Sequence, residues 1–316
     1  MKELISIVVP CFNEQEALPV FYDTIIPILS NFETNYEIII VDDGSKDNTA
    51  SIAKNLASKN KNIKYVIFSR NFGKEAAMYA GLEAAKGDYV AVMDVDLQDP
   101  PELLNEMYLT LKKEDYDCVA TRRVTRKGEP KIRSWFARQF YKLINKWSQT
   151  EVVDGARDYR LMKRNMVDSI LSLKECNRFS KGIFSWVGYK TKWLEYENIE
   201  RCAGVTKWNF KKLFVYAIEG FLAFTLQPLY LLIKLGVALL SLDFIATLSL
   251  TVLEILHACD VLKTHFFEWW VILILVSVAL TSLIIICLGI LGLYQAKIYT
   301  EIKQRPIYIA KEKNTK

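Results

Sequence analysis

Two carboxylates separated by one residue are the strongest chemical signal in this chain of 316 residues. Asp94 and Asp96 follow the apolar run Tyr89–Met93, which is typical of a buried β-strand. Carboxylates at positions i and i+2 after a strand can both turn toward one ligand, and a hard cation that bridges two phosphates needs such oxygen ligands. The pair therefore indicates metal-assisted chemistry at a phosphate, although a solvated turn with helix-capping aspartates gives the same pattern.

A second acidic cluster follows an earlier apolar run. The segment Asp42–Ser45 contains two aspartates and comes directly after Tyr36–Val41. Its carboxylates can accept hydrogen bonds from the base or the ribose of a nucleotide, while Ser45 and Asp47 can cap the next helix, and both readings can hold together. The chain has neither GxxxxGK[ST] nor GxGxxG, which excludes a P-loop and leaves a dinucleotide site unsupported.

The elements that must position these clusters alternate between strand and helix. The strand-like runs are Leu4–Pro10, Tyr36–Val41, Asn62–Phe68 and Tyr89–Met93. The helical patterns are Glu16–Asn31, Asp47–Ser58 and Lys74–Ala85. This alternation predicts an α/β fold with a mostly parallel sheet covered on both faces, with ligands beyond the carboxyl ends of the strands.

The second half of the chain is much more apolar than the first. Val271–Leu293 has 23 residues without a charged side chain, enough for a transmembrane helix. Leu235–Leu253 is a second expected span, interrupted only by Asp243, which costs about 2.5–3.5 kcal/mol at a membrane centre. Lysines and arginines gather after the later span, whereas the loop between the spans contains only Lys263, so we expect both termini in the cytoplasm.

A basic stretch precedes the apolar half. Thr121–Lys146 carries lysines and arginines interleaved with aromatic residues, which suits an anionic membrane surface. Nucleic acid or a plain solvated helix face would tolerate the same composition. The expected organisation is a catalytic domain over 1–210 with the basic segment in 121–147, an interfacial helix 211–228, spans 229–256 and 271–293 around a loop 257–270, and a basic tail 294–316.

Neither the N-terminal segment nor the cysteine pattern indicates export. The start Met1–Pro10 lacks the apolar core of a signal peptide, so we expect a cytoplasmic domain. The six cysteines have no CxxC pair and no regular spacing. They are expected to be buried free thiols, which argues against a disulfide framework or a metal cluster.

Several longer segments together resemble one enzyme family. They are Val8–Glu14, Val41–Ser45, Ser69–Glu75, Asp94–Glu102, Asp158–Leu161, Arg201–Trp208 and Lys303–Tyr308. The chain is similar to family-two glycosyltransferases of the GT-A fold, and more narrowly to bacterial bactoprenol (undecaprenyl-phosphate) glucosyltransferases, relatives of dolichol-phosphate mannose synthase. The similarity covers nearly the whole chain.

The resemblance implies a role for each matching residue. Donor-binding residues would be Pro10, Asn13, Glu14, Asp42, Asp43, Lys74, Asp94 and Gln98. Asp96, with Asp94, would hold Mg²⁺ or Mn²⁺, and these two would form the catalytic group with Asp158. The acceptor phosphate would be held by Arg122, Arg126, Arg201 and Lys207. Because a lipid phosphate has a second pKa of about 6, Asp158 would orient the acceptor as readily as deprotonate it, and a structural role beside Arg160 is also open.

The same resemblance implies the partners. The donor would be UDP-glucose or another UDP-sugar, and the acceptor would be undecaprenyl phosphate in the bilayer of a bacterial inner or plasma membrane. The chain would form a homo-oligomer, a tetramer as in relatives. A downstream flippase and a membrane glycosyltransferase would take up the product, and no nucleic acid would be bound. The lipid-linked sugar would modify an envelope glycan such as O-antigen or teichoic acid. Two departures affect the acceptor side and the choice of sugar: Arg157 stands where relatives have glycine, and Val205 where many have an acidic residue.

Two other functions are weighed against this one. A processive polysaccharide synthase or another lipid glycosyltransferase of the same fold is the nearest alternative, but the QxxRW segment of synthases is absent. A non-catalytic membrane scaffold is the more distant one, and the retained donor-site carboxylates argue against it.

Overall fold

The computed structural model describes residues 2–124, 145–146, 153, 155–197, 225, 227–258 and 269–315. The chain divides into two units, the first formed by Met1–Phe224 with Gln304–Lys316 and the second by Thr225–Lys303. The first unit contains an eight-stranded sheet in the order β7-β5-β6-β4-β1-β2-β3-β8.

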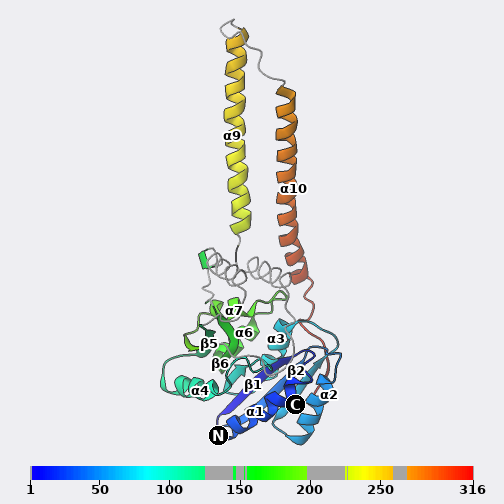
Figure 1. Ribbon diagram of the computed structural model, residues 1–316, viewed down its shortest axis with the longest axis vertical. Coiled ribbons are helices and arrows are strands. Elements are labelled where there is room, and N and C mark those ends of the chain that lie inside the picture. The colour runs from blue at the N-terminus through cyan, green and yellow to red at the C-terminus, as the bar shows by residue number, and fades with distance from the viewer. Residues whose placement is uncertain are drawn as a thin grey trace. The chain divides into compact units, whose positions relative to one another are not determined.

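The strands and helices of the first unit alternate along most of its length (Figure 1). The strands are β1 (Leu4–Cys11), β2 (Asn35–Asp42), β3 (Ile63–Phe68), β4 (Tyr89–Val92), β5 (Cys118–Arg123), β6 (Ala156–Lys163), β7 (Thr191–Tyr196) and β8 (Ala310–Lys313). The helices are α1 (Ala17–Ser30), α2 (Thr49–Lys59), α3 (Lys74–Ala84), α4 (Leu103–Lys113), α6 (Arg164–Ser172) and α7 (Ser180–Trp186).

The predicted α/β fold with a mostly parallel sheet is confirmed. β1 pairs in parallel with β2 and β4, and β2 pairs in parallel with β3. These strands are almost continuously buried, as expected when helices cover both faces of a parallel sheet. The carboxyl ends of β1, β2 and β4 therefore lie along one edge, which gathers the polar clusters that follow them.

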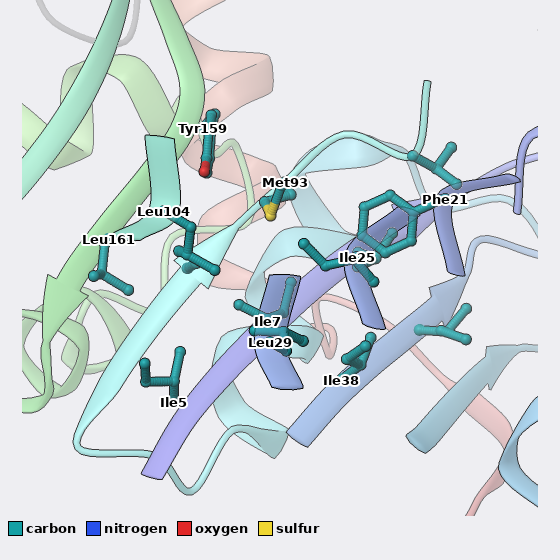
Figure 2. Close-up of a cluster of buried hydrophobic side chains, with 14 of the residues drawn as sticks. Ile5, Ile7, Phe21, Ile25, Leu29, Ile38, Met93, Leu104, Tyr159 and Leu161 are labelled. Carbon is teal, nitrogen blue, oxygen red and sulfur yellow. The ribbon is translucent and has the colours of Figure 1, made fainter. Parts of the chain in front are cut away.

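Two apolar layers hold the sheet between its helices. One layer packs α1, α2 and α4 against side chains such as Ile5, Ile7 and Leu161, several of which Figure 2 shows. The other layer packs α3, α6 and α7 against Val8, Val90 and their neighbours. Of the cysteines in described segments, Cys11 and Cys118 are buried, and all are free thiols.

Two strands join the sheet in ways that the sequence pattern does not reveal. β6 runs antiparallel between β4 and β5, and β8 adds an antiparallel edge beside β3. The segment 294–316 was expected to be a basic tail, but α10 continues to Ile302 and Ala310–Lys313 forms β8. The end of the described chain therefore belongs to the catalytic sheet.

The second unit consists of two long helices, α9 (Gln227–Ala258) and α10 (Trp269–Ile302). Many large apolar side chains on them are exposed, including Phe244, Ile285 and Leu288. Within the described residues, one stretch, Val276–Ile302, is long and apolar enough to cross a membrane, with a mean hydropathy of 2.6. The second expected span stays a prediction.

Candidate active site

A lysine joins two carboxylates at the edge of the sheet. The Lys74 ammonium lies 2.7 Å from Oδ1 of Asp94 and 2.5 Å from Oδ2 of Asp158. Lys74 is the first residue of α3, Asp94 follows β4, and Asp158 lies in β6. The three predicted site residues are thus brought together from three separate elements.

The position of Lys74 depends on two glycines. Gly73 precedes α3 with φ of +100°, a conformation that L side chains rarely adopt. Gly81 lies within α3, where an added Cβ would come 2.1 Å from Cγ1 of Val8. α3 can therefore approach β1 closely, which holds its first turn at the carboxyl edge of the sheet.

The antiparallel pairing of β4 with β6 explains why Asp94 and Asp158 meet. Val92 pairs with Arg160 in this register, so continuing it by two residues places Asp94 opposite Asp158. Both side chains then project from the same face of the sheet as Arg160, because side chains alternate along a strand.

The charges of this trio reinforce one another. Burial lowers the pKa of Lys74, but Asp158 and Asp94 outweigh that effect and hold the pKa well above its ordinary value. Burial raises the pKa of Asp158, but Lys74 outweighs it, with Lys181 and Arg160 contributing, and this pKa lies far below its usual range. A carboxylate with so low a pKa is a weak general base.

Asp43 holds the backbone that leads into α3. Its carboxylate accepts hydrogen bonds from the amide nitrogens of Phe72 at 2.6 Å and of Gly73 at 3.0 Å. Burial raises the pKa of Asp43 to about 6, although these two N–H groups and Arg70 lower it. Asp43 therefore positions Lys74 through the chain, in addition to any contact with a nucleotide.

The loops after β1 and β2 are joined by hydrogen bonds. The amide of Asn13 donates to Oγ of Ser45 at 2.8 Å, and the amide of Glu14 donates to Oγ1 of Thr49 at 2.8 Å. Asp42 is buried and accepts from the amide of Ser45 at 3.4 Å. Burial raises the pKa of Asp42, while Ser45 lowers it.

The capping alternative holds in part for this segment. Asp47 accepts hydrogen bonds from the amide and the hydroxyl of Thr49 at the start of α2. The predicted donor residue Pro10 lies near the end of β1, buried beside Val41. The hydrogen bonds between the loops after β1 and β2 hold these loops together, and the two loops form one wall of the candidate site.

Asp96 lies in a strained turn that follows β4. Its Oδ1 accepts from the amide of Gln98 at 3.2 Å, and the intervening Leu97 has φ of +54°. Positive φ at a bulky residue is a genuine outlier and is characteristic of ligand-binding turns. Within the described segments, no group of three or more His, Cys, Asp or Glu side chains is arranged to hold a metal ion. A cation at Asp94 and Asp96 would thus need oxygen ligands from a substrate.

A buried cluster behind this turn was not predicted from the sequence. Asp99 is 3% exposed and accepts from Nε of Arg157 at 2.9 Å and from the hydroxyl of Tyr196. Its second oxygen, Oδ2, has no hydrogen-bond partner among the described residues. Burial raises the pKa of Asp99, while Arg157 lowers it. The sequence shows that Arg157 departs from the family pattern, but it does not indicate that Asp99 is the partner of Arg157.

The predicted acceptor residues are only partly within the described chain. Arg122 is the last residue but one of β5 and forms an ion pair with Glu195 of β7. Arg126, Arg201 and Lys207 lie outside the described residues, as do most of the basic segment 121–147 and of the interfacial helix 211–228. The predicted acceptor site formed by these residues therefore stays a prediction.

The chain is similar to known proteins in sequence and in fold. The model of the family "Glycosyl transferase family 2" matches residues 6–171. CsbB of Bacillus subtilis (strain 168), which is named as a glycosyltransferase, is 40% identical over 98% of this chain and 92% of its own length. The bactoprenol glucosyl transferase of Shigella phage SfV is 38% identical over 99% of each chain. The crystal structure of mannosyl-3-phosphoglycerate synthase from Rubrobacter xylanophilus has a TM-score of 0.49 and 18% identity over 70% of this chain and 73% of that one, too little to transfer a ligand or a residue role.

Proposed function

The chain belongs to glycosyl transferase family 2 and is an enzyme that transfers a sugar, and we propose that it moves glucose from UDP-glucose to undecaprenyl phosphate. The observation that carries the reaction is the Asp94–Lys74–Asp158 arrangement at the edge of the sheet. The choice of acceptor is supported by the relatives named bactoprenol glucosyl transferase, which match along nearly the whole chain.

In the proposed reaction one bond forms and one breaks. An oxygen of the acceptor phosphate attacks C1 of the glucosyl group with inversion at C1, and the bond from C1 to the diphosphate breaks with its electron pair on UDP. Charge at C1 grows in an oxocarbenium-like transition state, which nearby carboxylates stabilise. Asp94 would orient the sugar, and the wall around Asn13, Glu14, Asp42 and Asp43 would hold the nucleotide, with Gln98 beside it.

Asp158 acts in this account by orienting the acceptor. Its lowered pKa makes it a weak base, and an acceptor phosphate with a second pKa of about 6 needs little deprotonation. Lys74 would approach the diphosphate or the sugar of the donor from the side of Asp94. A lysine that contacts both the donor side and Asp158 can therefore align the two substrates.

A divalent cation fits the donor side. Asp94 and Asp96 supply carboxylate oxygens, and Mg²⁺ is commonly bound by one or two carboxylates together with substrate phosphates. This donor set agrees with the lack of a third ligating side chain in the described chain. When bound, Mg²⁺ or Mn²⁺ would offset the negative charge of the leaving diphosphate.

The apolar helices support a membrane location. A soluble protein rarely exposes apolar surface as extensive as that of α9 and α10. We propose that both helices span a bacterial inner or plasma membrane, with the catalytic domain and both termini in the cytoplasm. A water-soluble donor would then meet a lipid acceptor at the membrane surface, in a homo-oligomer whose product passes to a flippase and a membrane glycosyltransferase.

A panel of donors tests this function. Purified enzyme is incubated with undecaprenyl phosphate and UDP-glucose, UDP-galactose or UDP-N-acetylglucosamine, and the lipid product is identified by its mass. The account predicts one glucose per lipid with UDP-glucose. A polymeric product would favour the synthase alternative. If no donor gave a lipid product and none gave metal-dependent release of UDP, the scaffold alternative would be favoured.

A further inference from the structure

One lysine near the trio of Lys74, Asp94 and Asp158 forms no ion pair with the part of the chain that the structure describes. Lys181 is the second residue of α7 and is half-buried. Its ammonium forms neither an ion pair nor a hydrogen bond with residues in the described segments. A half-buried ammonium without a partner is unfavourable unless a ligand or water accepts its hydrogen bonds. The residues around Lys181 therefore indicate which ligand it could bind.

The first anchor of α7 connects it to the residue beside Lys74. The amide of Ser180 donates to Oε2 of Glu75 at 2.9 Å, and the hydroxyl of Ser180 donates to the same oxygen. Glu75 directly follows Lys74 in the first turn of α3. The start of α7, and hence Lys181, is fixed next to the turn that presents Lys74.

The second anchor connects α7 to the strand that carries Asp158. The guanidinium carbon of Arg160 lies 3.7 Å from the centre of the Phe184 ring. Phe184 and Lys181 are three residues apart, so they share one side of α7. Arg160 and Asp158 are two residues apart in β6, so they share one face of the sheet. Lys181 therefore lies on the side of α7 that faces Asp158, and its charge contributes to the lowered pKa of that carboxyl.

Without Lys181, the group formed by Lys74, Asp94 and Asp158 would repel an acceptor phosphate. Lys74 is shared between Asp94 and Asp158, which leaves this group with a net negative charge. An acceptor phosphate carries about −1.5 to −2 at neutral pH and would be repelled by it. A second cation beside Asp158 would reduce this repulsion.

We propose that Lys181 binds the phosphate of the acceptor beside Asp158. This inference rests on the proposed function, because it assumes an acceptor that presents a phosphate. The Lys181 ammonium would offer its N–H groups to the phosphate oxygens that do not attack C1. Asp158 and Lys181 would together fix the orientation of the phosphate.

Binding of a short prenyl phosphate tests this role without turnover. The full-length enzyme is titrated with farnesyl phosphate, with the uncharged farnesol, and separately with UDP. Lys181→Met should weaken farnesyl phosphate binding by about 10-fold or more, because a hydrogen-bonded charge pair is lost. The affinities for farnesol and UDP should change by less than about 2-fold. Lys181→Arg should keep most of the affinity, since a guanidinium also binds phosphate.

Lys190→Met is the matched control, because Lys190 is an exposed lysine paired with Asp115 outside the site. If Lys181→Met no longer binds UDP and is not folded, Lys181→Gln replaces it in the same titrations. Unchanged farnesyl phosphate affinity in a folded variant overturns the role of Lys181. A wild-type enzyme that binds farnesyl phosphate no better than farnesol overturns the proposed acceptor itself, so the two failures are distinguishable.

Discussion

The ammonium of Lys74 lies 2.5 Å from Oδ2 of Asp158, although the two residues are 84 positions apart in the chain. The contact joins a residue of the proposed donor side to a residue of the proposed acceptor side. It also keeps Asp158 ionised, because the positive charge opposes the effect of burial on its pKa. Lys74 is therefore the residue on which both halves of the proposed reaction depend.

Removing this ammonium should change both the rate and its pH dependence. We expect Lys74→Met to lower kcat by about 100-fold or more, the usual effect of losing one well-placed donor in an active site. The pKa of Asp158 should rise, because the effect of burial is then less well compensated, so the residual activity should fall more steeply in mildly acidic buffer than the activity of the wild type. Steady-state rates measured across a pH series test this, and Lys192→Met at an exposed pair with Glu114 is the control. A variant with unchanged kcat would contradict the assignment.

The buried pair of Asp99 and Arg157 should contribute to stability. Asp99→Ala leaves the Arg157 guanidinium without its carboxylate, and breaking a buried pair in this way costs about 3–5 kcal/mol. Arg157→Gly, which introduces the residue that relatives have, should also destabilise the domain, because Asp99 then keeps only Tyr196. The double variant should be less destabilised than the two single effects added together. Thermal unfolding of the four proteins gives the coupling, and strict additivity would show that the pair does not interact.

Asp43 should make stability depend on pH in a defined direction. Its pKa of about 6 in the folded protein is above the ordinary value of 3.8, so the folded state binds this proton more tightly than the unfolded state. Its contribution to stability should be fully present below about pH 3.8 and lost as the pH rises through about 6. Asp43→Asn removes this titration. The difference in unfolding temperature between wild type and Asp43→Asn, measured from pH 4 to 8, should therefore shift against the wild type as the pH rises and become constant above 6.

The segment after α10 should stabilise the catalytic sheet. The ring of Tyr308 stacks on Phe68 at 4.8 Å, and its hydroxyl donates to Oε2 of Glu83 at 2.5 Å. Tyr308→Ala should destabilise the first unit by about 2 kcal/mol, less than the 3–5 kcal/mol of a fully buried aromatic residue because Tyr308 is half-buried. Lys311→Ala at an exposed position of β8 should have little effect. Equal unfolding temperatures for the two variants would show that the Tyr308 contact is unimportant.

The donor edge could be predicted because its signals are local. Asp42 and Asp94 each follow an apolar run, and parallel strands bring such run ends to one edge whatever their order in the sheet. The helices between the runs are also set by local patterns, and the observed bounds differ from the predicted ones by at most two residues for most elements. The resemblance to a family added roles for these residues but not their contacts.

The acceptor side could not be predicted because it depends on distant pairings. Asp158 reaches Asp94 only through the antiparallel register of β4 and β6, and nothing in the sequence around Asp158 indicates that register. Lys181 and the partner of Arg157 depend on packing between elements far apart in the chain. Ala310–Lys313 carries two lysines in a short, mostly exposed strand, a pattern that does not distinguish an edge strand from a tail.

The most direct test of the account compares the lipid product of the wild type with that of Asp158→Asn. Both proteins are supplied with UDP-glucose, undecaprenyl phosphate and Mg²⁺, and the mass of the lipid is followed over time. The account predicts that the wild type adds one glucose to the lipid and that Asp158→Asn, which still binds UDP, does so at least about 100-fold more slowly. Equal rates for the two proteins, or a wild type that leaves undecaprenyl phosphate unchanged, would contradict it.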